Sequence, residues 1–389
     1  MKEILLVAAE NSAENYALQV VSEFRSRNAA VRFFGIGGER LERQGMEIVI
    51  PSRELAVVGI VEVLRHIPRI RRALNRLLKT AVERRAAAAL LVDFPDFNLR
   101  LARRLKAAGI PAYYYISPTV WAWRYRRVHQ LRRAVERLFI IFPFEIPIYQ
   151  REKVPFTYVG HPLAHIVRAK TERREMRRRL GVGDNEHLVA ILPGSREQEV
   201  RRLLPRMLVA LDRLGEELPL RAALLQAHGI PSALLDDTLG SRSLPIVSQN
   251  DGYDLLQAAD AALSSCGSAN LECALLGTPF VAAYRVNRLS YALGKGLVKI
   301  GRYSIVNILA GKEVVPELIQ GRCRSADMAR ELRSVLMDNE RRRFMSAEFA
   351  RIREQLQQER DPAAIVCDEM ASRLMPDSEG GEGESPARP

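Results

Sequence analysis

Short apolar runs alternate with longer amphipathic stretches along nearly the whole chain, and they form two series. In the first series, the predicted strands are residues 4–8, 31–36, 88–92, 112–116 and 137–141. Helical periodicity appears between or after them at 15–27, 61–85, 99–108 and 126–134. Strands that alternate with helices are typical of a parallel sheet covered by helices. The first series therefore predicts a doubly wound, Rossmann-like domain.

The second series repeats this pattern in the C-terminal half. Its predicted strands are residues 188–192, 221–225, 246–247, 261–263 and 280–283, and its predicted helices are 201–214, 232–239, 253–258 and 268–276. Further helical patterns follow over 327–375. The predicted fold class is thus α/β, with two Rossmann-like doubly wound domains.

Gly160 and Pro162 interrupt the pattern between the two series and mark the best boundary. We therefore predict an N-terminal domain over 1–165 and a C-terminal domain over 166–375. For the last helices of the C-terminal domain, packing against the first domain is left open. Residues 376–389 are rich in Gly, Glu, Ser and Pro, which predicts a disordered tail.

Bulk properties narrow the class of protein. The longest apolar run, residues 86–92, is far below the roughly 18 residues that a membrane span needs, and the N-terminus shows no export signal. The cysteines have no C-x-x-C spacing, which favours a reducing cytoplasm; they are Cys266, Cys273, Cys323 and Cys367. The net charge of +13 indicates an anionic partner, although arginines on solvated helix faces account for it equally well. Aromatic residues make up only 6%, so no stacking platform for nucleic acid is evident.

Two glycine-containing turns follow strands of the second series. Gly194, Ser195 and Arg196 come after the strand 188–192 and precede a helix. A glycine lets backbone amides approach a phosphate, the helix N-terminus adds positive potential, and an arginine can bind phosphate with two hydrogen bonds. Alone, such a turn is more often a simple connection.

The second turn contains Gly267 and Ser268 and leads into a helix that carries Glu272. A carboxylate about one helical turn in can accept hydrogen bonds from a ribose diol, although it can also be an ordinary solvated side chain. The chain contains no G-x-x-x-x-G-K-[ST] and no G-x-G-x-x-G motif, which argues against a P-loop NTPase and a dinucleotide-dependent dehydrogenase. The two turns together favour a nucleotide site.

In the first series, acidic residues follow two strands. Asp93 and Asp96 come after the apolar run 86–92, and Glu10 with Ser12 comes after the first strand. A partly desolvated carboxylate at a strand's carboxyl end is suited to act as a general base on a substrate hydroxyl. Asp96 is also a candidate N-cap of the next helix, so Asp93 is the preferred base, with Glu10 as the alternative.

An apolar stretch lies beside an arginine cluster at residues 55–72. This arrangement suits a helix in the lipid headgroup region or a groove for acyl chains, but a core helix with a charged outer face would have the same pattern. The residues predicted to contact a membrane or acyl chains are Val58, Ile60, Val63, Leu64 and Arg65.

At these residues the chain resembles the lipid-A-disaccharide synthase family over nearly its whole length. The stretches that carry the resemblance are L-A-V…G-I-V-E-V-L at 55–64, D-F-P-D-F-N-L at 93–99, S-P-T-V-W-A-W-R at 117–124, P-F-E at 143–145, V-G-H-P at 159–162, L-P-G-S-R at 192–196, G-S-A…L-E at 267–272, and Asn307 with Leu309 and Ala310. The resemblance implies a GT-B-like fold with an interdomain cleft and no metal or other cofactor.

The implied reaction is the transfer of 2,3-diacylglucosamine from its UDP donor to the 6-hydroxyl of 2,3-diacylglucosamine 1-phosphate (lipid X), with inversion and release of UDP. By the same resemblance Arg196, Glu272 and Asn307 match donor positions, and Glu10 and Asp93 match carboxylates needed for activity. We place Ser12, Asp96, Asn98 and Gln320 with the substrate-binding candidates. The implied partners are the two lipid substrates and the cytoplasmic face of the inner membrane, with no nucleic acid; the oligomeric state is left open.

The chain departs from the family pattern near its N-terminus. Where the family has G-E-x-S-G-D, this chain keeps Glu10 and Ser12 but has Ala9, Ala13 and Glu14 at the other three positions. The two alanines would add a Cβ where the family's glycines allow a positive φ. Val306 replaces an expected proline.

Two other functions remain open from the sequence. One is a different UDP-sugar transferase or epimerase of the same fold, for which a water-soluble donor would suffice. The other is a basic, non-enzymatic protein that binds nucleic acid or anionic membrane, which predicts salt-sensitive binding unaffected by Asp93→Asn.

Overall fold

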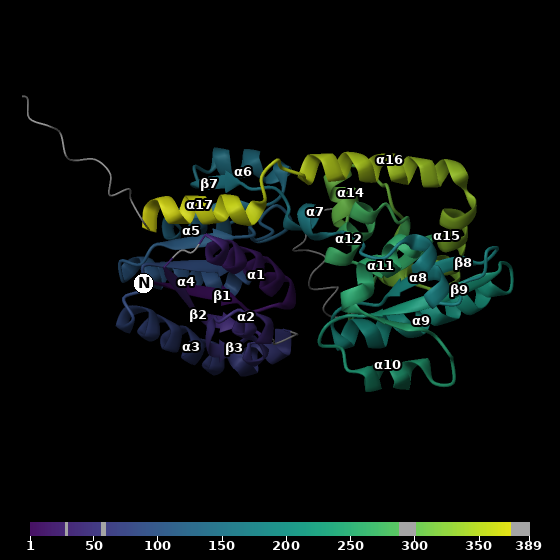
Figure 1. Cartoon of the computed structure of the whole chain (residues 1–389), viewed down its shortest axis with the longest axis horizontal. Helices are drawn as coiled ribbons and strands as arrows, with labels where there is room; N and C mark the ends of the chain where they lie inside the picture. Colours follow the sequence, from purple (N-terminus) through teal and green to yellow (C-terminus); the bar gives the residue numbers. More distant parts are fainter. Residues whose placement is uncertain (28–29, 56–59, 288–300, 375–389) are drawn as a thin grey trace, which may run out of the picture. The chain divides into compact units, whose positions relative to one another are not determined.

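The computed structural model describes residues 1–27, 30–55, 60–287 and 301–374. Contacts divide the chain into two units: the first contains Met1–Pro162 together with the segment from residue 358 onward, and the second contains Leu163–Gln357 (Figure 1). Each unit contains one parallel sheet with helices. The predicted α/β class with two Rossmann-like units is confirmed.

The sheet of the first unit has seven strands in the order β3-β2-β1-β4-β5-β6-β7. The strands are β1 (Lys2–Ala8), β2 (Val31–Gly37), β3 (Glu47–Pro51), β4 (Ala88–Val92), β5 (Ala112–Tyr115), β6 (Arg137–Ile140) and β7 (Phe156–Tyr158). The helices are α1 (Asn11–Ser26), α2 (Glu39–Arg43), α3 (Ile60–Glu83), α4 (Pro95–Ala107), α5 (Arg127–Ala134), α6 (Ile146–Arg151) and α17 (Pro362–Leu374). Every residue of β4 is fully buried, because helices cover both faces of a parallel sheet.

The sheet of the second unit has six strands in the order β10-β9-β8-β11-β12-β13. They are β8 (His187–Leu192), β9 (Leu220–Gln226), β10 (Ile246–Ser248), β11 (Ala261–Ser265), β12 (Phe280–Tyr284) and β13 (Glu317–Ile319). The helices are α8 (Arg173–Arg179), α9 (Glu197–Gly215), α10 (Ser232–Leu239), α11 (Gly252–Ala258), α12 (Ser268–Leu276), α14 (Ile305–Ala310), α15 (Ser325–Met337) and α16 (Asn339–Leu356), while α7 (Pro162–Ile166) lies at the boundary of the units.

The last described helix, α17, returns to the first unit and packs against α1 (Figure 1). Thr157 at the sheet edge donates a hydrogen bond of 3.1 Å to Glu369 of α17, and Arg27 at the end of α1 pairs with Asp368. The C-terminal helix is therefore part of the first unit's fold. Within the described ranges, no helix combines the length and apolarity that a membrane span requires.

Candidate functional site

The two sheets have the same reversal of strand order at their centres. In the first unit β1 pairs with β4, with Ala8 opposite Val92; in the second unit β8 pairs with β11, with Leu192 opposite Ser264. Ligands of doubly wound sheets bind beyond the carboxyl ends of strands at this reversal. The predicted acidic residues follow the first strand pair directly, and the two predicted glycine turns follow the second.

Asp93 lies in a strained turn at the end of β4. Asp93 and Phe94 have φ values of 49° and 48°, in the left-handed region that non-glycine residues rarely adopt. The carbonyl of Asp93 accepts hydrogen bonds from the Tyr114 hydroxyl at 2.6 Å and from the Asn98 amide at 2.7 Å. Left-handed residues of this kind cluster at functional sites, where surrounding contacts hold them. The turn presents a half-buried Asp93 side chain.

Asn98 stabilises this turn from the protein interior. Its side chain is fully buried, and its amide also donates to the carbonyl of Val92 at 3.2 Å. Asn270 in the second unit is equally buried and donates to the hydroxyl of Ser264 at 3.0 Å and the carbonyl of Ser265 at 2.8 Å. Equivalent asparagines thus hold the ends of the equivalent strands β4 and β11. The contacts described for Asn98 are with the chain itself, and its predicted substrate contact remains a prediction.

Asp96 is exposed in the first turn of α4, and its prediction as the N-cap is wrong. Phe94 is the N-cap residue, because the left-handed turn starts the helix two residues earlier than an N-cap at Asp96 would. The Asp96 carboxylate accepts hydrogen bonds from Arg124 at 2.9 Å and Arg127 at 2.7 Å, and both guanidinium groups lie over the ring of Trp123. Asp96 therefore ties the segment after β5 to the turn that carries Asp93.

Glu10 is exposed at the N-cap of α1, and Ser12 lies in the first turn of that helix. The neighbouring Glu14 is buried; its carboxylate accepts hydrogen bonds from Arg40 at 3.1 Å and from the backbone amide of Leu41 at 3.2 Å, so it stabilises the start of α2. Neither Ala9 nor Ala13 has a positive φ. Neither alanine therefore needs the positive φ that a glycine allows, since Ala13 lies inside α1 and Ala9 precedes it. An effect of the two added Cβ atoms on substrate approach remains a prediction.

A buried polar group lies beyond the ends of β6 and β7. Desolvation raises the pKa of Glu145 to about 8, and nearby Ser117 and Trp121 oppose this shift only in part. Desolvation also lowers the pKa of His161 to about 3, so its imidazole is neutral; it packs against the rings of Tyr16 and Phe142. The sequence offers no metal or triad partner for His161, which favours a structural or substrate-lining role, and it predicts no role for Glu145.

The turn after β8 requires its glycine. Gly194 has φ of 126°, and a Cβ at this position would lie 2.3 Å from a carboxylate oxygen of Glu199. That carboxylate accepts a 3.2 Å hydrogen bond from the amide of Ser195 and lies 3.4 Å from Arg196. An acidic group therefore already lies against the amide and guanidinium predicted to bind phosphate. This role of Glu199 cannot be predicted from the sequence pattern.

The turn after β11 is exposed to solvent. Gly267 and Ser268 are exposed at the start of α12, and a Cβ added to Gly267 would meet no atom of the described residues within 4 Å. The chain's own packing thus leaves room at this helix N-terminus. Desolvation raises the pKa of half-buried Glu272 to about 7, and a hydrogen bond from Tyr253 partly offsets this.

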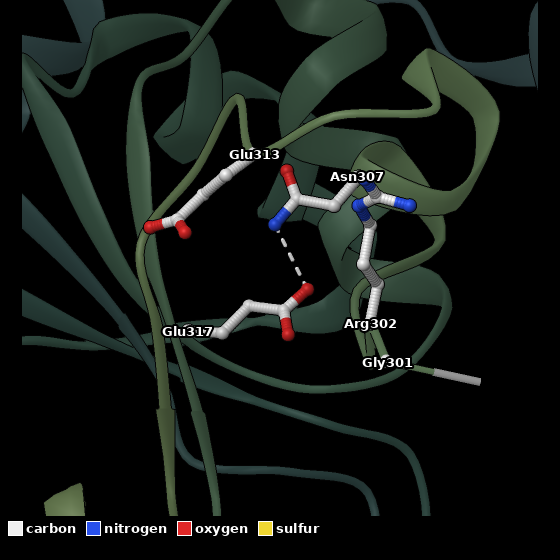
Figure 2. A pocket seen from close by; sticks show the side chains of 5 residues that line it. All are labelled: Gly301, Arg302, Asn307, Glu313 and Glu317. Atoms are coloured by element: carbon white, nitrogen blue, oxygen red, sulfur yellow. Dashed lines mark hydrogen bonds between the residues drawn. The ribbon is translucent and has the colours of Figure 1, made fainter. Parts of the chain in front are cut away.

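Both the oxygen and the nitrogen of the Asn307 side-chain amide are hydrogen-bonded to other groups of the chain. Its carbonyl oxygen accepts hydrogen bonds from the amides of Val314 at 2.7 Å and Val315 at 2.9 Å, and its amide donates to the carbonyl of Val315 and to Glu317, both at 2.8 Å. Figure 2 shows the amide of Asn307 directed at the Glu317 carboxylate, beside a cavity of about 330 Å³. Glu317 also accepts from the amides of Tyr303 and Ser304. The predicted donor contact of Asn307 remains a prediction.

Gln320 likewise has partners within the chain. With its amide oriented to satisfy both groups, it donates to the carbonyl of Val286 at 3.2 Å and accepts from the amide of Val286 at 3.1 Å. Its backbone has a positive φ of 51°. Gln320 therefore holds the segment that follows β12, and its predicted substrate contact is untested.

The predicted membrane-contact residues and the expected lack of a metal ion remain to be placed against the structure. Val58 lies outside the described residues, and so do the side chains of Ile60, Val63, Leu64 and Arg65, whose backbone belongs to α3. Among the described residues, no group of three or more His, Cys, Asp or Glu side chains is arranged to hold a metal ion.

Comparison with known proteins decides the family. The model of the lipid-A-disaccharide synthetase family matches residues 4–368 of the chain. The chain belongs to this family. Lipid-A-disaccharide synthases from Myxococcus xanthus and Solibacter usitatus are 41% and 39% identical to it, over 91% and 92% of this chain and 93% of each relative. The predicted family and the predicted enzyme class, a hexosyltransferase, are confirmed.

The fold agrees with this family. The structure is similar to that of CalG4, the calicheamicin glycosyltransferase, with a TM-score of 0.61 and 13% identity over 98% of this chain and 100% of the other. At that identity the likeness concerns the fold alone. The predicted GT-B-like fold class is confirmed for this member of the lipid-A-disaccharide synthase family.

Proposed function

We propose that this chain transfers 2,3-diacylglucosamine from UDP-2,3-diacylglucosamine to the 6-hydroxyl of 2,3-diacylglucosamine 1-phosphate. The products are the β-1,6-linked disaccharide 1-phosphate and UDP. Membership of the family supports the reaction class. The observation that carries the assignment of roles is that a strained acidic turn and a pair of glycine turns lie at the equivalent strand reversals of the two units.

Asp93 acts as the general base in this proposal. Its carboxylate takes the proton from the acceptor 6-hydroxyl, and the oxygen attacks C1 of the donor sugar on the face opposite UDP. Asn98 and Tyr114 hold the backbone carbonyl of Asp93, so they are positioning residues for this carboxylate. The support is geometric: a left-handed turn is retained where its contacts over-determine it. Glu10, at the end of the neighbouring strand, is the alternative base.

The second unit stabilises the leaving group. As the bond between C1 and the diphosphate oxygen breaks, negative charge develops on UDP. Arg196 and the N-termini of α9 and α12 are positioned at the strand reversal to stabilise this charge, and the open space at Gly267 admits the diphosphate. Glu199 would give up its contact with Ser195 when phosphate binds. Glu272 would accept hydrogen bonds from the ribose hydroxyls.

The reaction would take place at the cytoplasmic face of the inner membrane, with the enzyme bound peripherally. The acylated substrates and the net charge of +13 support this location. The predicted contact residues around Val58 belong to this part of the proposal.

The decisive experiment is a disaccharide assay in detergent, read by mass spectrometry, on wild type, Asp93→Asn, Glu10→Gln and Asp96→Asn. We expect Asp93→Asn to lower kcat by about 10²–10⁴-fold, because general base catalysis contributes that much. Asp96→Asn removes the same charge one helical turn away, and should cost less than tenfold. A large loss in Glu10→Gln alone would assign the base to Glu10.

UDP binding provides an independent measurement. UDP should raise the melting temperature of wild type and Asp93→Asn equally, and should fail to do so for Arg196→Ala. If wild type yields no disaccharide and UDP does not stabilise it, the proposal is wrong. Turnover of the UDP-sugar in the absence of acceptor would indicate an epimerase or hydrolase instead.

A further inference from the structure

Four arginines line one open cavity on the surface of the second unit, and none of them is assigned to the donor. Arg201, Arg202 and Arg206 come from α9, and Arg285 comes directly after β12. Together with Val286 and Asn287 they line a cavity of about 470 Å³. In the sequence alone, these arginines stand out only through their contribution to the net charge.

The cluster has little negative charge to offset it. Arg201 lies 3.9 Å from Glu197, and in the part of the chain that the structure describes no carboxylate pairs with the other three arginines. Arg285 donates to the carbonyl of Gln320 at 3.4 Å.

Such a cluster is suited to an anion with several oxygens. Like charges around one cavity repel each other, so an anion that binds them relieves the repulsion. Guanidinium groups bind phosphate through two parallel hydrogen bonds, which ammonium groups cannot do. Arg206 is held by a hydrogen bond to the carbonyl of Arg202, so part of the cluster is ordered before any ligand binds.

The lining of the cavity selects among anions. Among the described residues that line it there is no aromatic side chain, so they offer no surface on which nucleic-acid bases could stack. Arg196, assigned above to the donor diphosphate, is not part of the lining. We propose that this cavity binds the phosphate group of an anionic lipid headgroup. The choice of lipid over free phosphate rests on the proposed function, whose substrates are acylated.

The test measures sedimentation with vesicles of phosphatidylcholine containing 30% phosphatidylglycerol, compared with pure phosphatidylcholine. The pocket variant is Arg201→Ser/Arg202→Ser/Arg206→Ser. Each arginine near an anionic membrane contributes about fivefold to partitioning, so we expect the partition coefficient to fall about a hundredfold. Binding to pure phosphatidylcholine should change little. The UDP-induced rise in melting temperature should be retained, which also shows that the variant folds.

A matched control removes the same charge elsewhere in the second unit. Arg174, Arg213 and Arg343 are exposed and lie outside the cavity, so their triple replacement by serine should lower partitioning less than fivefold. An equal fall in both triples would overturn the proposal, because diffuse charge would then explain binding. A triple Arg→Lys variant of the pocket keeps the charge; full wild-type binding by that variant would also refute phosphate recognition by guanidinium groups.

Three further outcomes decide between ligands. Loss of UDP binding with normal vesicle binding would make the cavity part of the donor site. Stabilisation by inorganic phosphate without any vesicle effect, or equal competition by duplex DNA, would overturn the lipid assignment. The vesicle measurement needs no turnover, so it can succeed where the disaccharide assay fails, and the two proposals fail separately.

Discussion

Replacing Asn307 with alanine separates a structural role from a donor contact. The family resemblance places Asn307 at the donor, whereas in the structure its side-chain amide makes four hydrogen bonds to groups of its own chain. Two backbone amides and one carbonyl, from Val314 and Val315, depend on it for hydrogen bonds, and Val315 is fully buried. The alanine variant removes all of these bonds and one of the donors to Glu317.

The magnitude follows from these contacts. A buried polar group left without a partner costs about 1–3 kcal/mol. Asn307→Ala leaves three such backbone groups without their hydrogen-bond partner. The neighbouring cavity of about 330 Å³ can admit water to them. The lower end of the range therefore applies, which gives a loss of about 3 kcal/mol in the free energy of unfolding. For a unit of roughly 150–250 residues this corresponds to a fall of about 6–12 °C in melting temperature.

The assay is calorimetry with and without saturating UDP. Glu313→Ala is the matched control, because Glu313 lines the same cavity but is exposed and has no bond to Asn307. We expect the control to lie within about 0.5 kcal/mol of wild type. The folded fraction of Asn307→Ala should still bind UDP, with at most a modest loss of affinity.

One result would refute this reasoning. If Asn307→Ala melts within about 2 °C of wild type but no longer binds UDP, the hydrogen bonds described here are not what Asn307 contributes, and its direct contact with the donor would be the better explanation.

Three further predictions concern the same sites. The pKa of Glu272 is raised to about 7, and the ionised carboxylate can accept hydrogen bonds from both ribose hydroxyls, whereas the protonated acid keeps fewer acceptor sites. UDP affinity should therefore rise as pH increases through 7, and titration calorimetry of Glu272→Gln should show a weaker affinity with a smaller pH dependence, which the phosphate of UDP itself contributes. Asn98→Ala should lower kcat about tenfold or more with little change in the KM of the donor, because it releases the turn of Asp93; a change in KM alone would assign Asn98 to substrate binding. The pKa of Glu145 is raised from 4.5 to about 8, so the native state retains a proton that the unfolded state loses, and stability falls by about 1.4 kcal/mol per unit as pH rises from 4.5 to 8. The advantage of Glu145→Gln in melting temperature should therefore grow across that range and level off above it, and a constant difference would contradict a buried, protonated Glu145.

The inner strands could be predicted from the sequence, and most edge strands could not. All ten predicted strands are present, because a strand covered on both faces needs a continuous apolar run. The three missed strands, β3, β7 and β13, lie at sheet edges. Residues of β7 are all half-buried, so no apolar run distinguishes them from a loop.

The positions of the candidate residues could also be predicted, but not all of their contacts. Polar residues after buried strands pointed to Asp93 and to the turn at Gly194, because parallel strands bring their carboxyl ends to one edge. The inward direction of Asn98 could not be foreseen. It depends on a left-handed turn that Tyr114, 21 residues away from Asp93, holds by a hydrogen bond.

The sequence by itself determined the α/β class, the two-unit organisation and the family, because periodic burial and short motifs are local properties of the chain. The tertiary structure alone decided which polar atoms the chain satisfies itself and which it leaves for a ligand. Asn307 and Gln320 bind their own backbone, Gly267 faces open space, and four arginines from α9 and the end of β12 meet at one cavity. The physical reason is that hydrogen bonding and charge neutralisation depend on groups brought together by folding, and no local pattern records which groups those are.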